Sequence, residues 1–171
     1  MGEVPRLGLP FDPIARAGDT WEREFGPASA MRVATSVMRV HQILLARYDA
    51  VLRPYGITFA RYEALVLLRF SRTGALPLKV MGERLMVHPT SVTNIVDRLV
   101  SAGLVERTPN PADGRGVLAR LTGEGRAVVE RATRDLMDID FGLDVLDPGA
   151  REVVYEHLRS VRLAAGDVAG A

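Results

Sequence analysis

Two short helical patterns follow one another almost directly in the middle of the chain, and they limit the possible folds more than any other feature. The first pattern covers residues 78–85, directly after Pro77, with apolar residues at helical spacing. The second covers residues 89–101 and begins only three residues later, and Gly103 provides the left-handed residue that commonly ends a helix. Two short helices joined by so short a turn cannot lie antiparallel, so they must cross steeply. The sequence therefore predicts a helix-turn-helix.

The periodicity changes directly after the second helical pattern. Residues 104–108 and 117–121 are short runs typical of β-strands, and residues 109–116 between them are rich in proline, glycine and other turn formers. These runs predict a β-hairpin with a long tip. A hairpin that follows a helix-turn-helix forms a winged helix-turn-helix, so we expect a mainly α fold with a small β-hairpin wing.

Helical patterns also precede this central unit. A Gly- and Pro-rich arm, residues 1–11, leads to Asp12-Pro13, which has the form of a helix cap followed by proline at the first helical position. A longer pattern extends over about residues 29–53 and is apolar around much of its circumference, so it needs cover from more than one side. Thr58 is expected to cap the helix that follows.

The C-terminal part predicts two further helices. Thr122 is expected to cap a long helix whose apolar seam steps by three and four residues from Val129 to Leu146, and Asp147-Pro148 begins the last helix. A monomer of this length would leave such seams partly uncovered, whereas a second copy would bury them. The predicted organisation is an arm with a short extra helix (1–28), a helical dimerisation lobe (29–56 and 122–171) and a winged helix-turn-helix lobe (57–121).

Composition excludes several classes of function. The chain has no cysteine, which removes disulfides, zinc–thiolate sites and thiol-based sensing. No apolar run approaches the length of a membrane span, so we expect a cytoplasmic protein. The net charge of +1 hides an asymmetry, because residues 72–121 carry 7 basic and 4 acidic side chains while residues 122–171 carry 6 basic and 10 acidic ones. A basic middle suits a polyanion-binding lobe, although ordinary scatter of surface charge explains it almost as well.

The exposed side of the second short helix has the composition of a DNA-reading surface. Small hydroxyl side chains let a helix enter the major groove, Asn94 can pair with adenine, Arg98 can pair with guanine and Pro89 can touch a thymine methyl group. The hydroxyls near the positive end of the helix also favour a phosphate oxygen. An ordinary surface helix with a polar first turn is the alternative. The candidate reading residues are His88, Pro89, Thr90, Ser91, Thr93, Asn94 and Arg98.

The tip of the predicted hairpin favours the DNA-reading interpretation. Arg115 lies between two glycines in the run 113–116, and an arginine that projects from a loop apex can enter a narrow minor groove. Asp113 would repel phosphate on its own, so we expect it to hold Arg115 or Arg98 through a carboxylate–guanidinium pair.

The stretch HPTSVTNIVDRLVSAGLVERTPNPADGRGVLARLT resembles the recognition helix and wing of the MarR family of transcriptional regulators, and the resemblance extends over about residues 29–165. It implies a homodimer that binds a near-palindromic operator, with the recognition helices in successive major grooves and the wing arginines in the flanking minor grooves. It adds Arg107 to the DNA-binding candidates. Residues 116–118 lack the further charges that many family members carry there, so this wing is expected to make fewer phosphate contacts.

The same resemblance implies a small anionic or phenolic effector in a cleft between the dimerisation and DNA-binding lobes. Tyr48 and Tyr62 also suit a core, and a histidine on an apolar helix stripe is more often an interior or interface residue than a ligand contact. The candidate effector residues are Trp21, His41, Arg47, Tyr48, Tyr62 and Glu63.

Other classes of function have weaker support. His41, His88 and His157 lie far apart and match no catalytic pattern, so we expect neither enzymatic activity nor a cofactor. A constitutive architectural DNA-binding protein without an effector is the main alternative. Metal sensing through His41, His157 and carboxylates is a remote one, and the sequence predicts no metal site.

Overall fold

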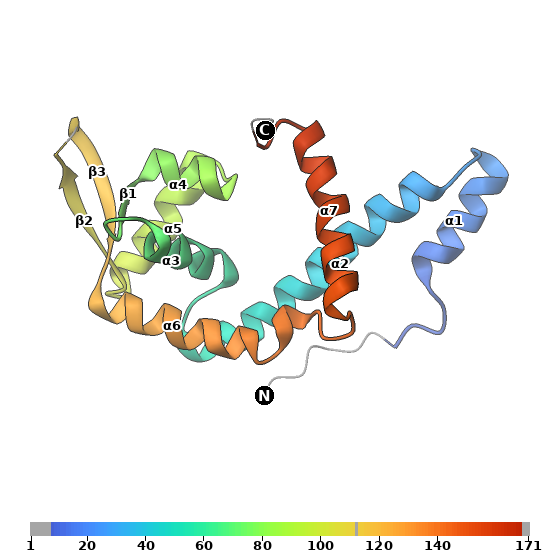
Figure 1. Cartoon of the computed structure of the whole chain (residues 1–171), viewed down its shortest axis with the longest axis horizontal. Coiled ribbons are helices and arrows are strands. Elements are labelled where there is room, and N and C mark those ends of the chain that lie inside the picture. Colours follow the sequence, from blue (N-terminus) through green and yellow to red (C-terminus); the bar gives the residue numbers. More distant parts are fainter. Residues whose placement is uncertain (1–7, 112, 169–171) are drawn as a thin grey trace.

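The computed structural model describes residues 8–111 and 113–168, and within them it confirms a mostly helical fold with a small antiparallel sheet (Figure 1). Residues 1–7 of the expected arm lie outside the described residues. In chain order the elements are α1 (Pro13–Glu24), α2 (Ser29–Leu52), η1 (Arg53–Tyr55), α3 (Phe59–Phe70), β1 (Ala75–Pro77), α4 (Leu78–Leu85), α5 (Pro89–Ser101), β2 (Val105–Asn110), β3 (Asp113–Leu121), α6 (Gly123–Met137), η2 (Asp140–Gly142) and α7 (Pro148–Ala164).

Polar side chains start most of the helices where the sequence places them. The carboxylate of Asp12 accepts the Ile14 N–H at 2.8 Å, and the hydroxyl of Thr122 accepts the Gly125 N–H at 2.9 Å. Thr58 is different, because its side chain makes no capping hydrogen bond. The first N–H of α3, that of Phe59, instead donates to Asp49 of α2 at 2.7 Å. A residue of the preceding helix therefore fixes the start of α3.

The sheet has one strand more than expected. β1 pairs with β3, and β3 pairs with β2, all antiparallel. The hairpin strands also extend further than predicted, since pairing continues to Asn110 and Asp113. The long tip expected over residues 109–116 is therefore wrong, and most of that segment is strand.

One hydrophobic core joins the sheet, α3, α4, α5 and α6. Leu65, Leu68, Met81, Val96 and Leu99 are fully buried in it. Leu52 at the end of α2 belongs to the same cluster, so α2 reaches into the core at one end, whereas α6 packs on it along most of its length up to Leu136. The elements α3 to β3 and the α6 helix that packs on them are called the winged-helix lobe below.

The long C-terminal helix predicted to continue to Leu146 ends at Met137. Three consecutive residues, Asp140, Phe141 and Gly142, have positive φ angles and redirect the chain before α7. Leu143 and Leu146 therefore lie outside α6, and the expected seam is interrupted.

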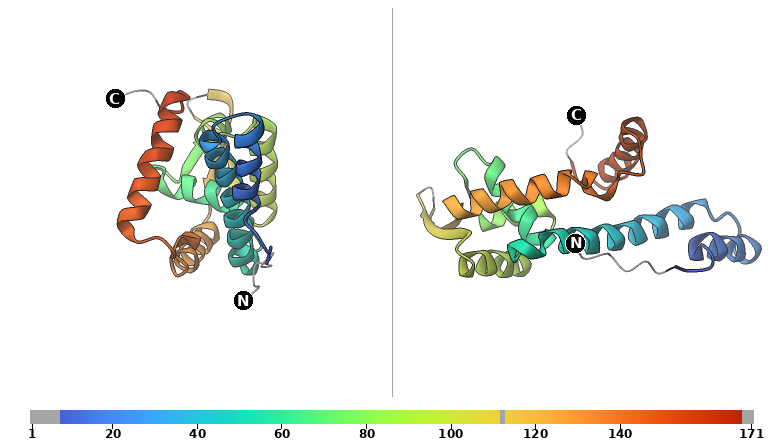
Figure 2. Two further views of the ribbon diagram at one scale, coloured as in Figure 1. Left: turned by 90° about the vertical axis from the view of Figure 1, so that its right-hand side faces the viewer. Right: turned by 90° about the horizontal axis from the view of Figure 1, so that it is seen from below.

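The helices α1, α7 and the first half of α2 lie apart from this core, and they are called the helical lobe below (Figures 1 and 2). Arg32 of α2 holds α1 through ion pairs of 2.8 Å to Asp19 and 2.6 Å to Glu22. No residue of α7 is buried. None of the helices in the described ranges combines the length and apolar character that a membrane span requires.

Candidate nucleic-acid interface

The helix α5 presents two chemically different faces because its sequence alternates at helical spacing. Val92, Val96 and Leu99 are buried against the core. The side chain of His88 starts the helix, since its Nδ1 accepts the Thr90 N–H at 3.3 Å, and Pro89 occupies the first helical position. The burial of its apolar face against the core and the cap at its first turn thus fix the orientation of α5.

The outer face of α5 carries the residues expected to read DNA. His88, Pro89, Thr90, Ser91, Thr93, Asn94 and Arg98 are all exposed. The Thr93 hydroxyl donates to the Pro89 carbonyl at 3.1 Å, which leaves its oxygen free to accept. Within the part of the chain that the structure describes, no carboxylate pairs with Arg98. The face is small, polar and carries a cation, which suits a base-reading surface.

Arg107 has a partner that sequence reasoning missed. It lies on β2, where its guanidinium forms a 2.6 Å ion pair with Asp97 on α5. Both side chains are partly exposed. The pair joins the helix to the wing, and the ten-residue separation across Gly103 gave no local pattern that could have revealed it. Arg107 therefore stays a candidate DNA contact whose side chain is held from α5.

The structure corrects the position of Arg115. The residue belongs to the strand β3 and not to a loop apex, because the strand begins at Asp113. Its side chain lies outside the described part of the structure. Asp113 is exposed and stands opposite Asn110 at the end of the hairpin. Asp113 therefore lies at the turn end of the hairpin, and Arg115 lies two residues further along β3.

Two of the candidate effector residues are core residues. Tyr48 donates its hydroxyl to the Phe141 carbonyl at 2.7 Å, and the hydroxyl of Tyr62 lies 3.0 Å from that of Thr133. Both rings pack on Phe59, with ring centroids 4.6 Å and 5.8 Å away. Burial raises the pKa of Tyr48, and the neighbouring charge of Arg47 partly offsets the rise.

The other candidate effector residues lie in two separate parts of the chain. His41 on α2 acts electrostatically on Glu63 of α3 and lowers its pKa, while desolvation, the larger effect, raises it. Glu63 is exposed as a residue, so the desolvation comes from protein lying against part of the side chain. Trp21 lies on α1, where its ring is tilted by 56° against that of Phe25 with the centroids 5.1 Å apart. The α1 helix lies at the end of α2 that is remote from the winged-helix lobe (Figure 1). The expected effector residues therefore do not line a single cleft within one chain.

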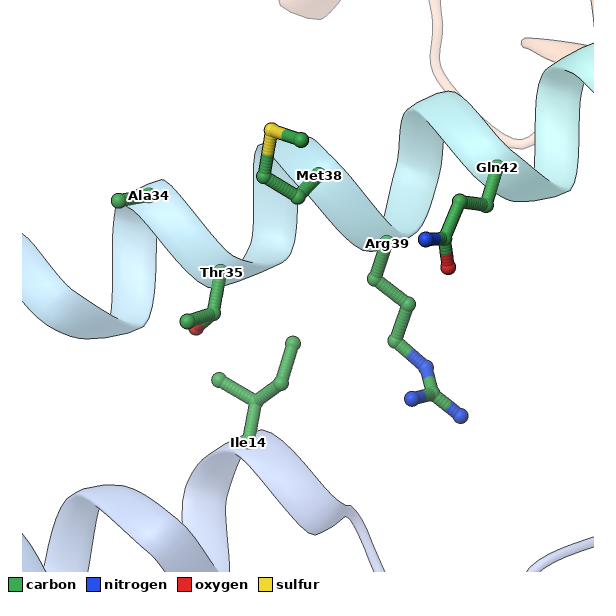
Figure 3. A pocket seen from close by; sticks show the side chains of 6 residues that line it. All are labelled: Ile14, Ala34, Thr35, Met38, Arg39 and Gln42. Carbon is green, nitrogen blue, oxygen red and sulfur yellow. The ribbon is translucent and has the colours of Figure 1, made fainter.

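A hollow of about 350 Å³ lies between α1 and α2 (Figure 3). None of the candidate effector residues contributes to it. Its lining residues are Ile14, Ala34, Thr35, Met38, Arg39 and Gln42. Among residues 8–111 and 113–168, no three His, Asp or Glu side chains lie close enough together to hold a metal ion.

Fold and site together define the class of protein: a winged helix-turn-helix protein with a polar recognition helix. The model of the MarR family matches residues 58–117, which cover the helix-turn-helix and most of the wing. The regulator PecS of Dickeya dadantii is 30% identical over 135 residues, which cover 77% of this chain and 78% of PecS. The chain belongs to the MarR family of transcriptional regulators.

Solved structures agree with this assignment. Sco5413, a MarR family regulator from Streptomyces coelicolor, is 58% identical, with a TM-score of 0.77 over 82% of this chain and 98% of that one. Sco3205 from the same organism, solved in complex with DNA, is 28% identical, with a TM-score of 0.72 over 78% of this chain and 86% of that one. The chain spans only 54% to 60% of the length of several other curated relatives that it matches.

Proposed function

We propose that this protein binds double-stranded DNA as a homodimer and represses transcription at a near-palindromic operator. The exposed polar face of α5 beside the wing is the observation that carries the proposal. The DNA complex of Sco3205, a relative with the same fold, supports it. A protein that acts on chromosomal DNA is expected in the cytoplasm. We propose no catalysed reaction.

Each candidate contact has a role that follows from its chemistry. Asn94 pairs with adenine, Arg98 pairs with guanine and Pro89 touches a thymine methyl group. Thr90 and Ser91, at the positive end of α5, bind phosphate, with His88 and Thr93 alongside. Arg115 enters the minor groove from the wing. Arg107 acts near the base of the same hairpin, and Asp113 acts at its tip.

The homodimer explains the exposed apolar residues of the helical lobe. Val37, Met38 and Ile43 on α2, and Val154 and Leu158 on α7, are all more than two fifths exposed in the single chain. Burial of such stripes between two copies related by a two-fold axis removes this surface from water and sets two recognition helices one DNA turn apart.

A small anionic or phenolic effector that relieves repression is the second part of the proposal. Burial raises the pKa of Glu63 on α3 and the charge of His41 on α2 lowers it, which supports a polar site between these two helices. Trp21 and Tyr62 can contact the same effector only if the second copy of the chain forms part of the effector cleft.

Selection of bound fragments from native genomic DNA tests the proposal most broadly. We expect one enriched half-site in inverted repeat, with half-sites about 10 base pairs apart. Asn94→Ala should relax the preference at particular base pairs, while an unaltered base profile would remove Asn94 from the reading surface. Equal binding to random duplexes would instead favour the architectural alternative.

Removal of the wing arginine gives a second test. Arg115→Ala should weaken operator binding by roughly 1–3 kcal/mol and reduce the dependence of binding on salt, since a guanidinium in the groove releases counterions. Fluorescence anisotropy with labelled duplex at several salt concentrations measures both quantities. Unchanged binding would show that the wing does not contact DNA.

A further inference from the structure

The turn between α6 and α7 has an unusual backbone. Asp140, Phe141 and Gly142 have φ angles of 48°, 49° and 73°, so three consecutive residues are left-handed. Only Gly142 adopts such a conformation without strain, and the other two persist only where their surroundings hold them. The contacts that hold this turn come from α2, which is remote from it in sequence, and from α7, which follows it.

The first set of contacts comes from α2. Tyr48 donates its buried hydroxyl to the carbonyl of Phe141 at 2.7 Å, and the two rings meet edge to face at 6.0 Å. Arg47 reaches the carbonyl of Gly142 at 3.4 Å and the carboxylate of Asp144 at 3.3 Å. A side chain at Gly142 would meet Leu44 of α2 at 2.9 Å, so the turn lies directly against this helix.

The second set comes from α7. Arg151 donates to the Leu143 carbonyl at 3.2 Å and to the Asp140 carboxylate at 2.9 Å. No residue of α7 is buried, and in the described part of the chain Arg151 makes both hydrogen bonds that join α7 to other elements. Within one chain, the direction of α7 therefore depends on this turn and not on packing against other helices.

We propose that Arg47, Tyr48 and Arg151 are positioning residues that hold the Asp140–Gly142 turn as a rigid joint, and that this joint sets the distance between the two recognition helices of the dimer. The proposal rests on the dimer of the proposed function but not on DNA binding. The dimer face includes α7, whereas α6 carries the winged-helix lobe, so the joint is one of two covalent links between the lobes, and α2 is the other.

The size of the effect follows from geometry. The 15 residues of α6 span about 22 Å, so a change of about 10° at the joint moves the far end of the helix by about 4 Å. One base pair rises about 3.4 Å along DNA. A loose joint would therefore shift each recognition helix by about one base pair, enough to lose the match to two fixed half-sites.

A distance measurement between the two copies tests the joint without DNA. The chain has no cysteine, so Lys79→Cys, at an exposed position on α4, gives one nitroxide label per protomer for pulsed electron spin resonance. Tyr48→Phe removes only the hydroxyl that binds the turn. Tyr55→Phe is the matched control, because it removes a hydroxyl that binds Asp135 of α6 at 2.6 Å, away from the turn.

We expect a narrow distance distribution for the labelled parent and for Tyr55→Phe, and a distribution wider by on the order of 4 Å for Tyr48→Phe. Arg151→Gln, at a partly exposed position on α7, should broaden it as well and provides the test if Tyr48→Phe does not fold. An unchanged width in the folded joint variants would overturn the proposal, as would equal broadening by Tyr55→Phe or the lack of a dipolar signal in the parent. A parent with a narrow distribution that ignores duplex DNA would instead contradict the DNA-binding function and leave the joint standing.

Discussion

The winged-helix lobe and the helical lobe differ in how far they bury their apolar residues within one chain. In the winged-helix lobe, Leu65, Leu68 and Leu99 are fully buried within one chain. In the helical lobe, α7 has no buried residue, and Leu158 on its apolar stripe is 43% exposed. The first lobe has a complete core of its own, whereas the second presents a surface that needs a partner.

The helix α2 shows both situations along its own length. Near its end, Tyr48 and Leu52 are buried in the core shared with α6. In its first half, Val33, Val37 and Met38 are exposed, and α1 packs beside this half of the helix (Figure 2). The same helix therefore connects a region that is stable within one chain with one that depends on association.

A charge on the exposed stripe should have the largest effect and would affect only the helical lobe. We expect Leu158→Asp to weaken self-association at least about 100-fold, because the dimer buries the unpaired carboxylate twice. Sedimentation velocity measures the change. Phe70→Asp, at an equally apolar and 81% exposed position of the winged-helix lobe, should leave association unchanged. Equal loss of the dimer in both variants would erase the distinction between the two lobes.

A cavity in the core tests whether the winged-helix lobe is stabilised by burial within one chain. Leu68→Ala should lower the free energy of unfolding by about 2–5 kcal/mol, because the residue is fully buried and the surroundings only partly collapse. Chemical denaturation at a fixed protein concentration measures this value. Phe70→Ala on the same helix should change it by no more than about 0.5 kcal/mol. A similar cost for both substitutions would contradict the burial pattern of α3.

The ionisation of Glu63 should have the smallest effect on the free energy of unfolding, and this effect should depend on pH in a defined direction. Desolvation raises the pKa of Glu63 in the folded chain, so the folded state binds a proton more readily than the unfolded state does. The charged form therefore costs stability, and that cost develops as the pH rises above the ordinary pKa of 4.5 and is complete above the raised pKa.

Replacement of Glu63 by the neutral glutamine makes the stability cost of the charged carboxylate measurable. Glu63→Gln should raise the free energy of unfolding at pH 7 by less than about 1 kcal/mol, since the residue is exposed and solvent screens the effect. The difference between the two proteins should vanish below the ordinary pKa of 4.5. Denaturation curves across this range check the sign, and a variant that is less stable at pH 7 would contradict it.

Local signals in the sequence were enough to predict much of the winged-helix lobe. The start of α5 at His88-Pro89, the end of that helix at Gly103 and the outward face that includes Asn94 all depend on neighbours within one or two helical turns. Strand β1 was missed because three residues carry no alternation and its partner, β3, lies more than 40 residues away. The position of Arg115 within a strand likewise depends on pairing across the hairpin.

The joint could not be predicted for a related reason. Apolar residues continue at helical spacing from Val129 to Leu146, Phe141 is not a residue type that favours a left-handed turn, and Asp140 favours one only weakly. The turn forms because Tyr48, more than 90 positions earlier, and Arg151 hold it. The ion pair of Asp97 with Arg107 is a further tertiary contact of this kind within the candidate site.

The mass of the complex with DNA tests the central claim most directly. Native mass spectrometry of the protein with a duplex from the genomic selection should show two chains of 18.7 kDa on one duplex, at a salt concentration where random duplexes of the same length stay free. One chain per duplex, or the same occupancy on random DNA, would contradict an operator-binding homodimer.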